Sequence, residues 1–553
     1  MRILLQCMPW LAALLSGVLA VGLFPPWNLE WLVWICMLPL LWALRAINSK
    51  KPKWGGFLLG YSAGAASGLI QFFWLSTVSG LAAVLLPLYL ALYWGVFGAF
   101  AASCFGCERR SGSAVVASAF SLAAVWAGLE CLRGWLFTGF SWNPLGVAFH
   151  ENVWISQSAD LLGVLGLSLF VIFLQVLALE AISRRRWQLV LPAIACVGLL
   201  LIYGSWRIRS LEKVPALDLK SMLVQINIPQ DAAEVLWPQL EVHQAYEDET
   251  IRGLEQAETA PDWVIWPETA LTGRLLVTPE GEWATWEIDF ETLSRVREKH
   301  DFELIYGVHK LEAERQEDGL LMPKIDGRSY NSMAMLSAEN RMLTHDKIHL
   351  VIFGETIPFV DSLPFLKKIY AQQAGVEYGG SFTAGDSWEP MQTSVRGKKI
   401  SVIPSICFED SVARLMRKFV RDEPQVIVNV TNDGWFKESP AAAQHFANTR
   451  FRAIELRRPM LRAANTGVSA AIDVLGRTQH PITGKSQKLV DANGSHFTRG
   501  TLMTQLPIPL DPIVSLYAIV GDWGIIGLAL LGVMMPCMQK TLSRKKRERA
   551  LIE

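Results

Sequence analysis

Three reactive side chains of this sequence lie at the edges of short apolar runs. Cys407 follows the run Ile400–Ile406, and Glu268 follows Trp263–Trp266 and one proline. Lys347 lies in the segment HDKIHLVIFGETIP. Short apolar runs between polar residues predict buried strands, and the chemistry of α/β domains gathers at the carboxyl ends of strands. A thiol is a candidate nucleophile, a carboxylate can take its proton, and an ammonium group can stabilise an oxyanion, so the three residues predict acyl transfer through a cysteine.

Each of the three residues also has a structural explanation. Cys407 is the only cysteine between Cys196 and Cys537, and free cysteines are often small buried core residues. Glu268 could cap a helix, and Lys347 could be a solvated loop charge. The order Glu, Lys, Cys, with each residue at the rim of an apolar strand in one domain, favours the catalytic interpretation.

The segments around these residues resemble the nitrilase superfamily, whose catalytic set is a glutamate, a lysine and a cysteine in this chain order. WPETAL, K-x-H-L-V-x-F-G-E and I-C-F-E are similar to motifs of the apolipoprotein N-acyltransferases, the integral membrane family of that superfamily. Ile352 stands where that family usually has proline, and Phe408 where tyrosine is frequent. Both residues keep apolar or aromatic bulk, so the resemblance stands.

Further residues near the three motifs are candidates for supporting roles. Glu355, eight residues after the lysine, is a candidate to position the lysine or the base, with a structural salt bridge as the alternative. The backbone amide of Phe408 could be a second oxyanion donor. Glu409 and Asn432 are candidate orienting residues, and Trp435 in TNDGWF is expected in the wall of the cleft.

The resemblance implies a specific reaction with two lipid substrates. Cys407 attacks a phospholipid ester and forms a thioester, and the α-amino group of the diacylglyceryl-modified N-terminal cysteine of an apolipoprotein then takes the acyl chain, in a ping-pong scheme. Trp237 is expected to border the acyl chain. The loop 356–380 is expected to move as a lid, with ordinary core packing as the alternative. No cofactor is expected, and the protein is expected to be a monomer.

The composition indicates a membrane protein. The chain has 553 residues, 51% of them hydrophobic, and a formal net charge of zero, which argues against a nucleic-acid partner. A spanning helix needs about 20 mostly apolar residues, and a signal peptide is a less favoured interpretation of the first segment because no cleavage site precedes FPPW. About eight spans are predicted, the second of them short: Pro9–Phe24, Trp31–Leu44, Gly55–Leu75, Leu81–Phe105, Val115–Cys131, Leu161–Ile182, Leu189–Trp206 and Tyr517–Met538.

The basic residues predict the orientation of these spans. Lys and Arg follow the second, fourth and sixth spans, and the tail KTLSRKKRERA follows the last, whereas FPPWNLE and STVSG contain neither residue. Cytoplasmic loops are enriched in Lys and Arg. Both termini are therefore expected in the cytoplasm of a bacterial cell, in the inner membrane. The predicted domains are a membrane region 1–216, an extracytoplasmic catalytic domain 217–507, and a final span with its tail 508–553.

The pattern of strands and helices predicts an α/β fold for the catalytic domain, and the resemblance to the nitrilases implies an α-β-β-α sandwich. A helix is expected over Ala441–Leu456, with a break at Pro459 and a return strand. Six segments predict strands: MLVQINIP, WVIWP, FELIYGV, NSMAMLS, ISVIPSIC and QVIVNVTN.

Two features of the membrane region have open interpretations. Glu130 and Arg133, near the end of the fifth span, form either a structural ion pair within an aromatic belt or part of a lipid-facing wall. Cys104 and Cys107 form a lone CxxC, which we interpret as a helix end because no second pair or histidine is near. No metal site is expected.

Two other classes of protein compete with the acyltransferase. A membrane-anchored amidase or hydrolase of the nitrilase type explains the three residues but leaves the spans without a purpose. A transporter or receptor with an inert outer domain usually has ionisable groups in mid-span, and the predicted spans have few apart from Glu130 and Arg133.

Overall fold

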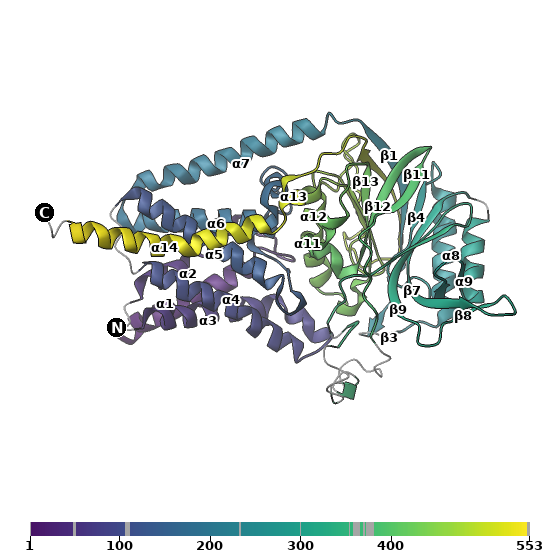
Figure 1. The fold of residues 1–553 in the computed structure, drawn as a ribbon, viewed down its shortest axis with the longest axis horizontal. Coiled ribbons are helices and arrows are strands. Elements are labelled where there is room, and N and C mark those ends of the chain that lie inside the picture. Colours follow the sequence, from purple (N-terminus) through teal and green to yellow (C-terminus); the bar gives the residue numbers. More distant parts are fainter. Residues whose placement is uncertain are drawn as a thin grey trace. The chain divides into compact units, whose positions relative to one another are not determined.

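The computed structural model describes residues 2–47, 51–105, 111–231, 234–298, 300–352, 354–357, 365, 367–368, 371 and 381–549. Contacts between residues divide the chain into two compact units. The first comprises Met1–Ser76, Gly80–Ser210 and Ser515–Glu553, and the second Thr77–Ser79 and Leu211–Val514. Figure 1 shows the helical first unit in purple, blue and yellow and the sheets of the second in teal and green.

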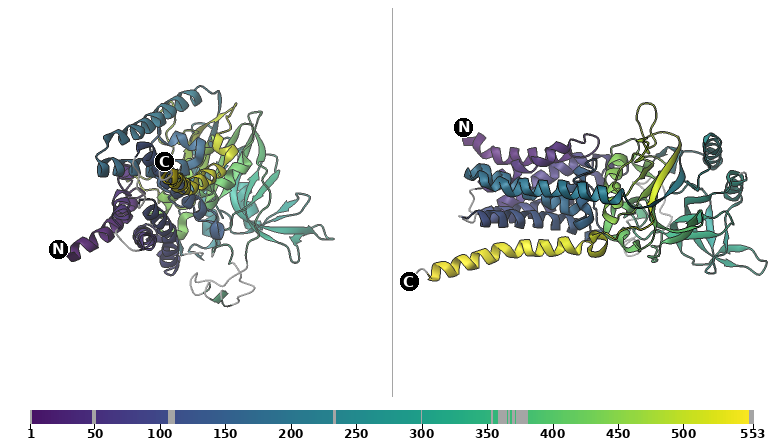
Figure 2. Two further views of the ribbon diagram at one scale, coloured as in Figure 1. Left: turned by 60° about the vertical axis from the view of Figure 1, so that its left-hand side comes forward. Right: turned by 90° about the horizontal axis from the view of Figure 1, so that it is seen from above.

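Helices that run alongside one another make up the first unit (Figure 2). They are α1 (Arg2–Val21), α2 (Leu38–Ala46), α3 (Pro52–Gln71), α4 (Ala82–Phe105), α5 (Gly112–Arg133), α6 (Ala159–Arg184), α7 (Val190–Leu211), α13 (Leu516–Val520) and α14 (Trp523–Arg549). Within the described residues, four helices are long and apolar enough to cross a membrane, namely Ala82–Phe105, Gly112–Arg133, Ser156–Arg184 and Trp187–Leu211. Cys7–Val21 and Trp523–Pro536 are shorter apolar helices. The count of eight spans stays a prediction.

The second predicted span is wrong as one continuous helix. A 3₁₀ helix covers Glu30–Trp34, and α2 begins only at Leu38 and has nine residues. Proline in the first turn of α2 explains the new start. The side chain of Gln175 on α6 bonds the interrupted backbone, accepting from the Met37 amide and donating to the Val33 carbonyl, each at 2.8 Å. A side chain thus supplies the partners that a broken helix lacks inside an apolar bundle.

Two charged residues near the end of the fifth predicted span, Glu130 and Arg133, hold the loop that follows. Glu130 accepts a hydrogen bond from the Leu145 amide at 2.9 Å, and Arg133 donates to the Trp142 carbonyl at 3.0 Å. Both charged side chains are buried. The loop in turn exposes an apolar side chain, Phe137, which is 79% accessible. Each of the two side chains therefore holds the backbone of this loop, and the two interpretations of the pair stay predictions.

Two sheets form the centre of the second unit. The first has the order β10-β9-β7-β4-β1-β16, with β5, β6 and β8 attached to it, and the second has the order β11-β12-β13-β14-β15. The first contains β1 (Ala216–Gln225), β4 (Trp263–Ile265), β5 (Arg274–Val277), β6 (Trp283–Ala284), β7 (Glu303–Arg315), β8 (Leu321–Pro323), β9 (Ser329–Leu336), β10 (Met342–Asp346) and β16 (Gly500–Pro509). The second contains β11 (Met391–Val395), β12 (Lys398–Ile406), β13 (Gln425–Thr431), β14 (Met460–Ala464) and β15 (Ala470–Ile472), and β2 (Gln230–Asp231) pairs with β3 (Glu234–Val235).

Apolar side chains join these sheets into a four-layer sandwich. Residues of both sheets, such as Ile265 of β4 and Val428 of β13, share one buried cluster. The other face of the first sheet packs against α8 (Gln239–Gln256) and α9 (Glu287–Arg297) through a second cluster. α12 (Ala441–Leu456) covers the second sheet (Figure 1). The α-β-β-α sandwich is confirmed.

Most of the expected elements in this unit are present at the expected places. The six predicted strands are β1, β4, β7, β9, β12 and β13, and α12 has the predicted bounds. After Pro459 the chain returns as β14. The predicted lid, 356–380, lies outside the described residues except at 356, 357, 365, 367, 368 and 371, so its motion stays a prediction.

Candidate active site

Glu268, Lys347 and Cys407 meet in the second unit. Glu268 follows β4, Lys347 follows β10 and Cys407 follows β12, so two residues come from one sheet and the third from the other. The Lys347 ammonium lies 3.6 Å from Oε1 of Glu268, and the charges of both Glu268 and Lys347 act on the Cys407 thiol. The structure therefore brings the three predicted residues together.

The backbone presents Cys407 in a strained conformation. Its φ is +53°, in the left-handed region, at the first residue of a 3₁₀ turn that spans Cys407–Ser411. Such a conformation is uncommon for a residue other than glycine and persists only where the surroundings hold it. Asn429 of β13 helps to hold it by donating to the Cys407 carbonyl at 3.2 Å. The turn bends the chain sharply at the residue that follows strand β12.

Lys347 is buried and paired with two carboxylates. Its Nζ donates to Oε1 of Glu355 at 2.8 Å, in addition to its contact with Glu268. Burial alone would lower the pKa of Lys347, but the carboxylates of Glu355 and Glu268 more than offset burial and raise it. The lysine therefore stays a cation at neutral pH and can stabilise an oxyanion without giving up a proton.

Glu355 is held in its charged form beside this lysine. Burial opposes the charge, but the ammonium of Lys347 and the hydrogen bonds to the carboxylate lower the pKa of Glu355. One of those bonds comes from the Val351 amide at 2.8 Å. Glu355 thus pairs with the lysine, and its predicted role in positioning Lys347 stays a prediction.

Asn331 is a residue of the site that the sequence motifs do not reveal. From β9, its Nδ2 donates to Oε1 of Glu268 at 2.8 Å and to Oε1 of Glu355 at 2.6 Å. One amide group therefore joins the carboxylates on either side of Lys347. Its position in an apolar strand, N-S-M-A-M-L, carries a signal: a buried asparagine among apolar residues needs partners.

Glu409 connects the lysine segment to the cysteine strand. Its carboxylate accepts from the amides of Ile348 at 2.7 Å and His349 at 2.9 Å, and from the amide of Ile406 at 2.8 Å. Burial raises the pKa of Glu409 to about 7, although Lys347 and these amides favour the charge. These bonds tie the two segments together, and the orienting role of Glu409 stays a prediction.

The other predicted residues lie less directly at this centre. Phe408 is half-buried, and its ring stacks on His349 with centroids 6.0 Å apart. Asn432 caps the next turn by accepting from the Gly434 amide at 3.0 Å. Trp435 is half-buried in that turn, and Trp237, also half-buried, packs against the core under α8. Their roles in binding stay predictions.

The electrostatics favour a neutral thiol at rest. Burial, reinforced by the charge of Glu268, raises the pKa of Cys407 well above its usual range, and Lys347 only partly offsets this rise. Burial also raises the pKa of Glu268, against the attraction of Lys347. Since a neutral thiol is a weak nucleophile, attack requires the carboxylate to take the proton as the new bond forms.

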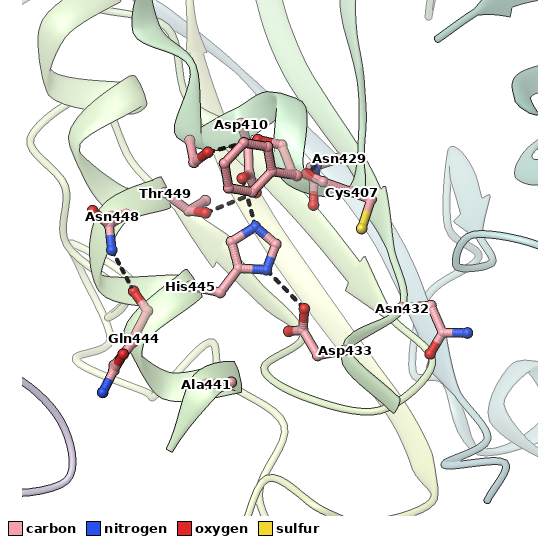
Figure 3. A network of polar contacts seen from close by, with 12 residues as sticks. Cys407, Asp410, Asn429, Asn432, Asp433, Ala441, Gln444, His445, Asn448 and Thr449 are labelled. Carbon is pink, nitrogen blue, oxygen red and sulfur yellow. Dashed lines mark hydrogen bonds and ion pairs between the residues drawn. The ribbon is translucent and has the colours of Figure 1, made fainter. Parts of the chain in front are cut away.

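A second group of buried polar residues, which the sequence analysis did not identify, lies beside the turn that carries Cys407 (Figure 3). His445 of α12 lies between Asp410, in the cysteine turn, and Asp433, in the turn after β13. Arg462 of β14 contacts both aspartates. The usable signal in the sequence was that Asp410 and Asp433, like Cys407, closely follow apolar strands.

Within the described residues, no group of three or more His, Cys, Asp and Glu side chains is arranged to hold a metal ion. Cys104 is buried in α4. Cys107 lies outside the described residues, so the interpretation of the CxxC as a helix end stays a prediction.

Comparison with known proteins identifies the family. The model of the apolipoprotein N-acyltransferase N-terminal domain matches residues 16–177, and the carbon-nitrogen hydrolase model matches residues 223–495. The apolipoprotein N-acyltransferase of Geobacter metallireducens is 30% identical over 495 residues, 84% of this chain and 85% of the relative. That of Brucella melitensis biotype 1 is 30% identical over 536 residues, 91% of this chain and 90% of the relative. The chain belongs to the apolipoprotein N-acyltransferase family.

This family assignment confirms the resemblance seen in the motifs. A solved CN-hydrolase superfamily protein from Xanthomonas campestris aligns with 57% of this chain and 97% of its own, at 16% identity and a TM-score of 0.30. The match to the carbon-nitrogen hydrolase model agrees with the sandwich of the second unit. Family membership and the long apolar helices together make this member of the family a bacterial membrane protein.

Proposed function

We propose that the protein transfers an acyl chain from a phospholipid to the α-amino group of the diacylglyceryl-modified N-terminal cysteine of apolipoproteins. Two kinds of support combine: relatives along most of the chain carry the name apolipoprotein N-acyltransferase, and the site holds a thiol, a base and a fixed cation. The observation that carries the proposal is the buried ammonium of Lys347, 3.6 Å from Glu268 and beside Cys407.

In the first half of the reaction, Cys407 takes the acyl chain. Glu268 accepts the thiol proton as Sγ bonds to the ester carbonyl carbon, and the carbonyl electrons move onto oxygen. Lys347 and the amide of Phe408 stabilise that oxyanion. The tetrahedral intermediate collapses, the C–O bond of the ester breaks, and the lysophospholipid alkoxide leaves with the proton held by Glu268. A thioester remains on Cys407.

In the second half, the acceptor amine takes the acyl chain from the thioester. The amine nitrogen attacks the thioester carbon, Glu268 accepts an N–H proton, and Lys347 again stabilises the oxyanion. The C–S bond then breaks, and the proton on Glu268 returns to sulfur. Cys407 is regenerated, and the acceptor leaves as an amide, which completes a ping-pong cycle.

The remaining parts of the chain have supporting roles in this proposal. The apolar helices, about eight spans in all, place the catalytic domain 217–507 on the outer face of the inner membrane, where acyl donor and acceptor are concentrated. Glu355 and Glu409 hold the lysine and the cysteine turn, and Asn432 orients the neighbouring turn. Trp237 and Trp435 border the acyl chain, and the enzyme acts as a monomer.

Mass spectrometry of the purified protein tests this function. After incubation with a phospholipid, the peptide that contains Cys407 is expected to carry one acyl group, which a diacylglyceryl lipopeptide with a free amine removes as the N-acyl product. Cys407→Ser is the matched control and should show no thioester. An unmodified Cys407 under these conditions would contradict the proposal.

The match to carbon-nitrogen hydrolases favours one second candidate, a membrane-anchored amidase. Its reaction would use the same three residues but end with water as acceptor. A labelled phospholipid separates the two functions, because an amidase leaves no lipid acyl group on Cys407.

Wild-type acyl-enzyme formation by Trp237→Ala would count separately against a role for Trp237 at the acyl chain.

A further inference from the structure

His445 has a carboxylate at each of its two ring nitrogens. Nδ1 lies 2.7 Å from Oδ1 of Asp433, and Nε2 lies 2.8 Å from Oδ1 of Asp410 (Figure 3). An ionised carboxylate only accepts hydrogen bonds. Either neutral tautomer of the ring would point a nitrogen lone pair at one of these oxygens. The doubly protonated ring is therefore the form that satisfies both contacts.

The charges around this ring also favour the cation. Arg462 contacts both aspartates. Its Nη2, which can only donate, also lies 3.0 Å from Nδ1 of the histidine and opposes the proton on that nitrogen. With a charged ring, two carboxylates and two cations cancel in a buried space. With a neutral ring, the four groups would carry one net negative charge. Burial and Arg462 oppose the charged ring, but Asp410 and Asp433 outweigh them and raise the pKa of His445 to about 9.

Other groups that face the cluster leave this balance unchanged. Thr449 of α12 donates to Oδ2 of Asp410 at 2.7 Å, and Asn429 accepts from Arg462 at 2.7 Å. Both are uncharged. His496 also faces Asp433, and burial lowers the pKa of that histidine, so it is neutral at pH 7.

The cluster reaches the nucleophile by two routes. Asp410 lies three residues after Cys407 in the same 3₁₀ turn. Asn429, which accepts from Arg462, donates from its other end to the Cys407 carbonyl at 3.2 Å. The charge of Asp433 also acts on the thiol and raises its pKa. A change in His445 is therefore expected to alter both the position of the Cys407 sulfur and the charge near it.

We propose that His445 is a positioning residue for the nucleophile: as a buried imidazolium it holds the turn that presents Cys407 and cancels the charge of a carboxylate that would otherwise disfavour the thiolate. This inference rests on the proposed role of Cys407 as the nucleophile. In the proposed reaction, His445 touches neither the acyl group nor the acceptor.

The test measures the alkylation rate of Cys407 by iodoacetamide at fixed pH in the full-length protein, with peptide mass spectrometry to separate this cysteine from the others. The rate follows the thiolate fraction. His445→Gln leaves the cluster with a net negative charge, so alkylation is expected to slow about tenfold, the effect of a rise of one in the thiol pKa. The double variant His445→Gln/Asp433→Asn restores a neutral cluster and is expected to recover most of the wild-type rate.

Two further variants separate charge from lost packing. His243→Gln is the matched control, because His243 is a buried histidine of α8 in the same unit, 3.3 Å from Asp289. It is expected to alkylate like wild type. Asp433→Asn alone removes a negative charge and is expected to alkylate at least as fast as wild type. If the cluster had a purely structural role, both His445→Gln and Asp433→Asn would alkylate more slowly than wild type.

The outcomes are decisive in each case. A His445→Gln protein that alkylates like wild type, or a double variant as slow as the single one, would overturn the inference. If His445→Gln does not fold, the Asp433→Asn variant tests the inference alone. Alkylation of Cys407 in Asp433→Asn that is slower than in wild type would then overturn the inference. Wild-type protein that alkylates at Cys407 but never forms an acyl-enzyme would contradict the proposed function instead and leave the inference standing.

Discussion

Gly307 packs against the backbone that carries Glu268, and alanine at this position is expected to displace the proposed base. A Cβ atom there would lie 2.5 Å from Cα of Glu268 and 2.8 Å from the amide nitrogen of Thr269. Ordinary contact begins at 3.4 Å, so one backbone must move by the difference from 2.5 Å, about 0.9 Å. Neither can move alone, because the Gly307 amide donates to the Pro267 carbonyl and the Gly307 carbonyl accepts from the Ala270 amide, each at 3.0 Å.

A misplacement of about 1 Å costs an enzyme roughly a hundredfold in rate. Gly307→Ala is therefore expected to form the acyl-enzyme on Cys407 about a hundredfold more slowly than wild type. The added methyl group is also expected to lower the free energy of unfolding by about 1–3 kcal/mol through overpacking. The assay mixes enzyme with a labelled phospholipid, quenches at timed intervals and quantifies the adduct, below the melting temperature of the variant.

Gly500→Ala is the matched control for this prediction. Gly500 begins β16, and its added Cβ would lie 3.6 Å from Cδ1 of Leu489, an ordinary contact. This variant is expected to acylate like wild type. A folded Gly307→Ala enzyme that also acylates at the wild-type rate would refute the argument that the position of Glu268 controls the first step.

Three further predictions concern buried charges. Lys347→Met leaves the carboxylates of Glu268 and Glu355 facing each other without a cation; we expect about 3–5 kcal/mol less stability in chemical unfolding, and unchanged stability would contradict the pairing. Asn331→Ala removes two hydrogen bonds to those carboxylates and should lower the melting temperature and the acylation rate, at a cost of about 1.5–3 kcal/mol per bond to a charged group. The pKa of His445 is raised from 6.5 to about 9, so its stabilisation is complete below pH 6.5 and is lost as the pH rises through 9. Melting from pH 6 to 10 should show a loss of about 3 kcal/mol that His445→Gln lacks.

The sequence was sufficient for the elements that local patterns determine. Apolar runs of strand length predicted β4, β12 and β13, and the helical pattern after Pro440 predicted α12, because alternation and periodicity are properties of neighbouring residues. The same reasoning joined Trp31–Leu44 into one span, since an apolar run does not reveal a break that a distant glutamine satisfies.

Chain order and strand ends also predicted which three side chains would meet, because parallel strands of a sandwich bring their carboxyl ends to one region. The sequence did not reveal Asn331, His445 or Arg462 as partners of that site. Their hydrogen bonds join residues between 12 and 63 positions apart, and such pairs carry no local signal.

The sequence alone therefore predicted the kind of chemistry proposed here and determined the strands that position its residues, because residue type and hydrophobic pattern are local. The tertiary structure decided the protonation states, since a carboxylate or a histidine gains or loses its proton according to the buried charges that folding places beside it. For Cys407, Lys347 and His445, those neighbours come from other strands and helices of the sandwich.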